Sequence, residues 1–136
     1  MSSQNSTSFV SVLHIYYRLS HIFFIVEWKQ IDYNIGNHFD GTIFAAPTTG
    51  LYTFHATSEQ FNNTGDASIF VHVNGRPKLQ SRNYTKSNDF GFVTIQTTLK
   101  IAEDDKVEVR FNGKLSDANN TMKTHFEGRL ISELNE

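Results

Sequence analysis

The chain of 136 residues has no cysteine, two prolines and little net charge. Without cysteine it forms neither a disulfide scaffold nor a thiolate metal site, and it has no cysteine nucleophile. The lack of cysteine does not decide between an oxidising and a reducing compartment, because one domain of this size buries a core that is stable without disulfide bonds. A formal charge of −2 argues against non-specific nucleic-acid binding, which requires a basic surface.

Recognised catalytic motifs are also absent. The sequence contains no G-x-S-x-G elbow, no P-loop and no Rossmann glycine pattern. An enzyme is therefore the function class that the sequence supports least.

Long hydrophobic runs are scarce. The one apolar block, residues 10–26, is short for a membrane-spanning helix of about 20 residues. His14, Arg18 and His21 interrupt it, so a membrane span is the weaker interpretation. We expect strands instead, with Arg18 at a bend between them. Residues 1–8 are polar and uncharged, unlike a signal peptide. If the protein is secreted, its targeting sequence is expected either to have been lost or to lie outside this chain.

Strand-forming patterns dominate what is present. Phenylalanine occurs 12 times, and apolar and polar side chains alternate with the period of a β-strand. Asn74-Gly75 is typical of a two-residue hairpin turn, and Pro77 is expected to begin a short edge strand. About ten short strands favour an all-β sandwich of jelly-roll type. The main strands are predicted at residues 9–14, 21–28, 50–56, 67–73, 90–101, 106–111 and 124–131.

Aromatic, asparagine and glycine residues form one ordered series along the chain. Its members are Trp28, Asn34, Phe39, Phe44, Gly50, Tyr52 and Phe54, followed by Val73-Asn74-Gly75, Leu99-Lys-Ile101, Asp105-Lys-Val107 and Phe126-Glu-Gly128-Arg-Leu130. This series resembles the C1q domain, the globular head of complement C1q and its tumour-necrosis-factor relatives. The resemblance covers residues 8–132.

The resemblance implies a ten-stranded jelly-roll sandwich that assembles as a homotrimer. It implies a secreted recognition or signalling protein that is not an enzyme. The expected organisation is a flexible segment at 1–7, the domain at 8–133 and a tail at 134–136.

The chain also departs from the family pattern. The spacer between Phe39 and Phe44 is about two residues short, Ala56 stands where an aromatic is common, and Asp104 replaces a glycine. No Gly-X-Y repeat precedes the domain, so no collagen stalk is expected. These features indicate a divergent, invertebrate-type member.

Positive charge gathers around one expected edge hairpin, at Arg76, Lys78, Arg82 and Lys86. Such a patch suits anionic ligands such as lipopolysaccharide, phospholipid head groups or acidic glycans. The alternative is that these side chains only protect an exposed strand edge from pairing.

Some family members hold calcium near the trimer apex, and Asn83 and Asp89 are the nearest positions here. Calcium prefers several carboxylate and carbonyl oxygens, so two solvated turn residues are the simpler interpretation. Asn-x-Ser/Thr sequons, which mark glycan sites in a secreted glycoprotein, occur at Asn5, Asn62, Asn83 and Asn119. The resemblance places the last three in loops at the apex. Turn chemistry explains the same residues equally well.

The chain has 6 histidines, but none has the H-x-x-x-H or H-E-x-x-H spacing of a zinc site. A histidine at a trimer seam would instead make assembly sensitive to pH.

The favoured function is lectin-like pattern recognition in innate immunity, with carbohydrate or lipopolysaccharide as ligand and calcium as the one cofactor suggested. A tumour-necrosis-factor-like ligand for a protein receptor is the alternative, and a structural or adhesion module is a third.

Overall fold

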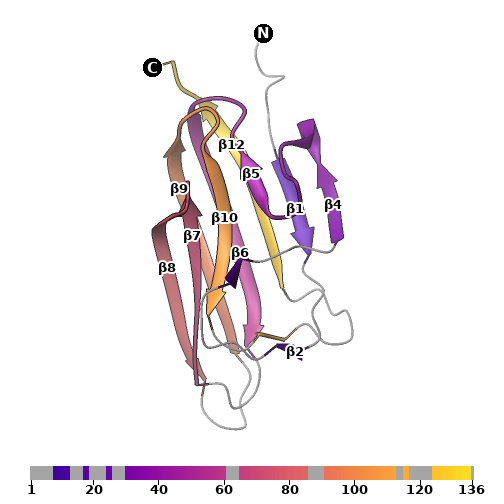
Figure 1. The fold of residues 1–136 in the computed structure, drawn as a ribbon, viewed down its shortest axis with the longest axis vertical. Helices are drawn as coiled ribbons and strands as arrows, with labels where there is room; N and C mark the ends of the chain where they lie inside the picture. Colours follow the sequence, from indigo (N-terminus) through magenta and orange to yellow (C-terminus); the bar gives the residue numbers. More distant parts are fainter. Residues whose placement is uncertain are drawn as a thin grey trace.

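The computed structural model describes residues 8–12, 17–18, 24–25, 30–60, 65–85, 91–112, 115–116 and 124–135. Within these ranges the chain forms twelve strands and one short 3-10 turn, η2 (Ile35–Asn37). The strands build two antiparallel sheets that lie face to face (Figure 1). This arrangement confirms the predicted all-β sandwich.

One sheet has seven strands and the other has five. The larger sheet runs β2 (Tyr17–Arg18), β11 (Leu115–Ser116), β6 (Gly50–Gln60), β12 (His125–Glu133), β1 (Ser8–Val12) and β4 (Gln30–Asn34), and β9 (Gly91–Ile101) also pairs with β6. The smaller sheet runs β3 (Phe24–Ile25), β10 (Lys106–Asn112), β7 (Gly65–Val73) and β8 (Arg76–Thr85), and β5 (Ile43–Ala45) also pairs with β10.

The strands are more numerous than the ten expected, because β2, β3 and β11 are pairings of only two residues. Arg18 is the last residue of β2, opposite Leu115; residues 19–23 lie outside the described residues, so the bend expected there stays a prediction. The short strand predicted from Pro77 is wrong: β8 spans ten residues. A register shift between Val71 and His72 of β7 lies beside Pro77, so β8 accepts a residue that lacks an N–H and continues past it.

Alternation along each strand separates the core from the outer faces. Tyr52, Phe54 and Ala56 of β6 point inward and are buried, as predicted. Side chains from the other strands complete the buried cluster, among them Ile69, Val71, Val93, Ile95, Val107, Val109, Phe111 and Phe126. Burial of each such side chain contributes about 1.5–3 kcal/mol.

Aromatic rings of the predicted motif form the centre of this core. Phe44 packs edge-on against Tyr52 at 5.6 Å and against Phe54 at 6.0 Å between ring centroids. Phe54 stacks on Phe126 at 6.2 Å, and Phe39 meets Phe126 edge-on at 6.0 Å. Offset and edge-on pairs add about 0.5–1.5 kcal/mol each beyond area burial. The motif aromatics therefore specify the core, except Trp28, which lies outside the described residues.

Backbone positions of the motif have their own constraints. Gly50 is buried beside β12, where an added Cβ would lie 2.5 Å from the carbonyl oxygen of Ser132. Gly128 is buried opposite Phe54. Asn74 and Gly75 both have positive φ, of 53° and 81°, which confirms the predicted hairpin turn.

The short spacer produces a tight turn, as expected. Phe39 and Phe44 pair directly across it. The carboxylate of Asp40 accepts hydrogen bonds from the N–H groups of Thr42 and Ile43, at 2.9 and 2.7 Å. These bonds satisfy donors that a longer loop would leave to solvent.

No helix in the described ranges is both long and apolar enough to cross a membrane.

Candidate functional site

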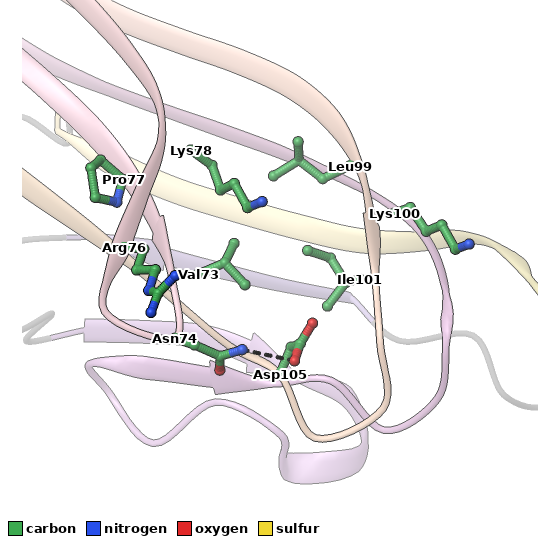
Figure 2. A pocket seen from close by; sticks show the side chains of 9 residues that line it. All are labelled: Val73, Asn74, Arg76, Pro77, Lys78, Leu99, Lys100, Ile101 and Asp105. Carbon is green, nitrogen blue, oxygen red and sulfur yellow. Dashed lines mark hydrogen bonds between the residues drawn. The ribbon is translucent and has the colours of Figure 1, made fainter.

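A pocket of about 580 Å³ opens at one end of the sandwich, between β8 and β9 (Figure 2). This is the end at which β9 and β12 finish, since Gly50 pairs with both Ile101 and Glu133. Apolar side chains form part of its wall, namely Val73, Pro77, Leu99 and Ile101. The Asn74–Gly75 turn brings β8 back along β7 and so places the start of β8 beside the pocket.

Positive side chains border the pocket from both strands. Arg76 and Lys78 come from β8, and Lys100 comes from β9. All three are exposed, and their single acidic neighbour among the lining residues is Asp105. An apolar wall beside several cations suits a ligand that has both a carbon framework and an anionic group.

The carboxylate of Asp105 is hydrogen-bonded to neighbouring donors. It accepts hydrogen bonds from the side-chain amide of Asn74 at 2.8 Å and from the N–H of Ala102 at 3.0 Å. Asn74 also accepts a hydrogen bond from the N–H of Lys106 at 2.9 Å. Asp105 therefore fixes the two turns that frame the pocket.

The structure divides the predicted basic patch. β8 is an edge strand, as expected, and only Arg76 and Lys78 lie at the pocket. Arg82 is four residues beyond Lys78 along the strand, roughly 13 Å away, and forms an ion pair with Asp66 at 2.7 Å. This pairing lowers the pKa of Asp66, mainly through the hydrogen bond from Arg82. Lys86 lies outside the described residues.

The predicted calcium and glycan residues are only partly described. Asn83 lies within β8, opposite Ala67, so the loop expected around it is wrong. The strand continues to Thr85, because β7 offers pairing partners as far as Gly65. Asn5, Asn62, Asp89 and Asn119 lie outside the described residues. Calcium binding and glycosylation stay predictions.

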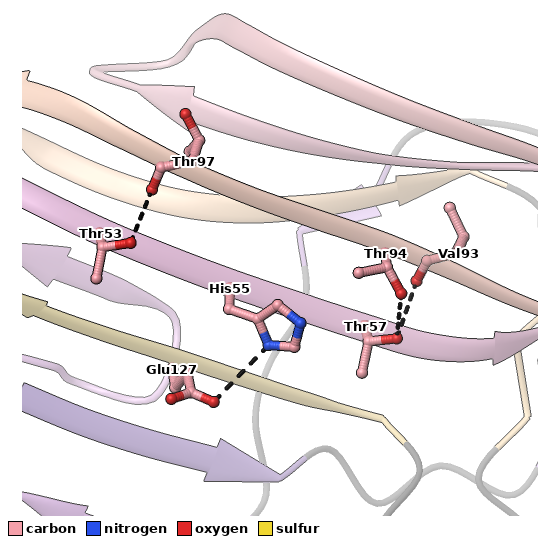
Figure 3. Close-up of polar contacts among 7 residues, drawn as sticks. All are labelled: Thr53, His55, Thr57, Val93, Thr94, Thr97 and Glu127. Carbon is pink, nitrogen blue, oxygen red and sulfur yellow. Dashed lines mark hydrogen bonds and ion pairs between the residues drawn. The ribbon is translucent and has the colours of Figure 1, made fainter.

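A second surface is the outer face of the seven-stranded sheet, where Thr53 and Thr57 of β6 lie beside β9 (Figure 3). Thr53 donates to the carbonyl oxygen of Thr97 at 3.2 Å, and Thr57 lies 2.7 Å from the hydroxyl of Thr94. The hydroxyls of Thr53 and Thr57 are therefore hydrogen-bonded within the sheet.

Two histidines lie on the same face. His55 of β6 is directly opposite Glu127 of β12, with Nδ1 and the carboxylate 3.7 Å apart. The His55 and His125 rings lie 5.4 Å apart. Burial lowers the pKa of His125, and the nearby His55 lowers it further. His125 is therefore predominantly neutral at neutral pH.

Sequence reasoning missed Lys100 and this histidine pair. Because side chains alternate along a strand, His55 faces away from the core that contains Tyr52 and Phe54. His125 and Glu127 likewise face the other side of the sheet from buried Phe126. The register between β6 and β12, which brings the three together, depends on a pairing between distant segments.

The fold is shared with solved structures of low sequence identity. Murine APRIL at pH 5.0 superposes with a TM-score of 0.74 at 15% identity, covering 93% of this chain and 100% of that chain. The globular domain of zebrafish complement 1qA gives 0.73 at 14% identity, covering 94% and 99%. Eiger TNF from S. frugiperda gives 0.69 at 13% identity, covering 96% and 94%. These similarities confirm the jelly-roll fold.

Sequence comparison identifies the family more directly. No curated protein sequence matches the chain significantly. A scan against protein families matches residues 9–131 to the C1q domain. The match contains the described aromatic core, the Asn74–Gly75 turn and the strands that border the pocket. This chain belongs to the C1q domain family.

Proposed function

We propose that this chain is a trimeric extracellular recognition module that binds anionic groups of carbohydrates or microbial surfaces. The observation that carries the proposal is the pocket, where Arg76, Lys78 and Lys100 border an apolar wall. C1q and tumour-necrosis-factor domains typically act as recognition or ligand modules and are generally not enzymes. Family membership and pocket chemistry therefore support the same class of function.

An acidic glycan fits the pocket better than a bare ion does. A sugar ring supplies apolar C–H faces for Pro77 and Leu99, and its sulfate or carboxylate groups accept hydrogen bonds from Arg76 and Lys78. Arg76 offers a planar fork that matches such groups, whereas Lys78 acts as a point charge. The proposed ligand contacts therefore involve two of the four residues of the predicted basic patch, Arg76 and Lys78.

The trimer is part of this proposal. C1q and tumour-necrosis-factor domains form trimers, and the outer face of the seven-stranded sheet has features of a contact surface. Phe92 is 51% exposed and Ile131 is 53% exposed, and satisfied threonines lie on the strands between them. Second and third copies of the chain would cover these apolar groups.

A glycan and lipid array, read with and without a chelator, tests the ligand class. Sulfated or carboxylated glycans are expected to bind, and neutral glycans are not. Loss of binding with chelator, restored by Ca²⁺ and not by Zn²⁺, would support calcium at Asn83 and Asp89. Retention only of neutral sugars, or no binding at all, would reject the anion-recognition proposal.

Multi-angle light scattering tests the assembly. The expected mass is three times the 15.5 kDa of one chain. Phe92→Glu places a charge on the proposed contact face and is expected to yield monomers, whereas Tyr84→Glu on β8 keeps the trimer. A monomer at all concentrations would reject the trimer.

A further inference from the structure

The arrangement of His55, His125 and Glu127 has a consequence independent of the pocket. One ligand atom from each side chain lies within 4.8 Å of those of the other two. A tetrahedral zinc ion with bonds of 2.0–2.1 Å separates its ligand atoms by about 3.3 Å. Small side-chain rotations close this difference, since Glu127 is half exposed and both imidazoles are only partly buried.

The backbone that holds these residues is regular. β6 and β12 pair in register along this segment, with Glu127 opposite His55 and His125 opposite Thr57. His55 and His125 are thus diagonal neighbours on one face, a spacing within reach of long side chains. Two ligands come from β12 and one from β6, so the site is complete within one chain.

The ligand chemistry favours a borderline transition metal. Two imidazoles and one carboxylate are the protein ligands of several open zinc sites, in which water takes the fourth position. Calcium and magnesium prefer oxygen ligands alone and fit poorly. In the described part of the chain, no side chain donates to or accepts from the ring of His125, so a metal would not have to displace a hydrogen bond.

We propose that His55, His125 and Glu127 form a zinc-binding site on the outer face of the seven-stranded sheet, the face that the proposed trimer covers, with a water molecule held in that contact completing the coordination. The three ligands carry one negative charge with both histidines neutral, so the occupied site has one net positive charge. On the neighbouring strand β9, the residues opposite His55 and Thr57 are the uncharged Gln96 and Thr94. Arg129, two residues beyond Glu127 on β12, is the nearest cation along that strand.

Metal uptake is expected to weaken in acid. A histidine must lose its proton to bind zinc, so protonation competes with the metal. The positive charge of Arg129 disfavours a further positive charge at the site, and the negative charge of Glu127 favours one. Affinity should therefore fall as the solution becomes more acidic.

Calorimetric titration of Zn²⁺ into the full chain, previously treated with chelator, tests the site. The expected result is one zinc per chain. His55→Ala and His125→Ala should each weaken binding by at least about tenfold. Co²⁺ provides a spectroscopic probe, because tetrahedral Co²⁺ absorbs visible light strongly and octahedral aqueous Co²⁺ does not.

Matched variants separate the site from general histidine binding. His38→Ala removes a histidine near η2, away from the sheet face, and should bind zinc as the unaltered chain does. Glu127→Gln keeps the size of an exposed side chain and preserves the fold, so it tests the site if a histidine variant unfolds. Unchanged affinity in Glu127→Gln and His125→Ala, equal weakening by His38→Ala, or no zinc uptake would overturn the proposal.

Discussion

Arg82 and Asp66 form a two-pronged ion pair across strands β7 and β8. Nε of Arg82 donates to one carboxylate oxygen at 3.0 Å and Nη2 donates to the other at 2.7 Å. This geometry holds the guanidinium away from the pocket. Positive charge on β8 therefore has two uses: Arg82 pairs within the sheet, and Arg76 and Lys78 border the pocket.

Arg82→Gln should leave ligand binding within about twofold of the unaltered chain, because an exposed charge four residues beyond Lys78, roughly 13 Å along the strand, is screened by salt. Binding of a sulfated oligosaccharide, measured by calorimetry at physiological ionic strength, checks this. Loss of affinity as large as that of Arg76→Gln would show that the ligand extends along the whole strand.

Asn34→Asp should destabilise the fold. The Asn34 amide donates to the carbonyl oxygen of Phe39 at 2.6 Å and accepts from its N–H at 3.3 Å. An aspartate keeps the acceptor but loses the donor, at a cost of about 1–3 kcal/mol in the free energy of unfolding. Urea unfolding measures the change. The neighbouring Asn37→Asp is the control and should have a much smaller effect, since its side-chain oxygen is retained.

Substitutions at Asp104 should separate backbone strain from side-chain chemistry. Asp104 has a φ of 71°, at the position where the family pattern has glycine. Asp104→Gly relieves about 1–2 kcal/mol of left-handed strain, offset by about 0.5–1 kcal/mol of added freedom in the unfolded chain. The net gain should lie between about 0 and 1.5 kcal/mol, whereas Asp104→Val should be clearly destabilising. Equal unfolding midpoints for the glycine and valine variants would contradict this account.

Stability should fall as the solution becomes acidic. Burial lowers the pKa of both His72 and His125 below their ordinary value of 6.5, with further lowering by Arg110 and His55 respectively. Below pH 6.5 the unfolded chain thus binds more protons than the folded chain. The stabilisation is complete above that pH and is lost as the pH falls through the folded-state values.

Melting temperatures between pH 7.5 and pH 5, recorded with chelator present, test this dependence. The double variant His72→Gln and His125→Gln should give a flatter profile than the unaltered chain. An unaltered chain whose melting temperature is constant or rises towards pH 5 would refute the assignment.

Much of the fold could be predicted because its signals are local. Alternation at Tyr52, Phe54 and Ala56 identifies the inward face of β6, and Asn74-Gly75 identifies a turn from two residues alone. The length of β8 could not be predicted, because the register shift beside Pro77 is set by the partner strand.

The site was less accessible to prediction for the same reason. Arg76 and Lys78 were identified from charge, but Lys100 reaches the pocket from the opposite sheet. His55 and Glu127 are far apart in sequence and meet only through the β6–β12 register. Spacing rules for metal ligands describe helices and short loops, so they do not detect a site formed across two strands.

Binding of a sulfated oligosaccharide to the Arg76→Glu and Lys78→Glu double variant tests the central claim most directly. Charge reversal replaces two donors beside the pocket, and affinity measured by calorimetry should fall by about tenfold or more. Arg82→Glu, which reverses one charge on β8 away from the pocket and off the proposed trimer face, is the control and should leave affinity nearly unchanged. An affinity for the double variant equal to that of the unaltered chain would contradict recognition at this pocket.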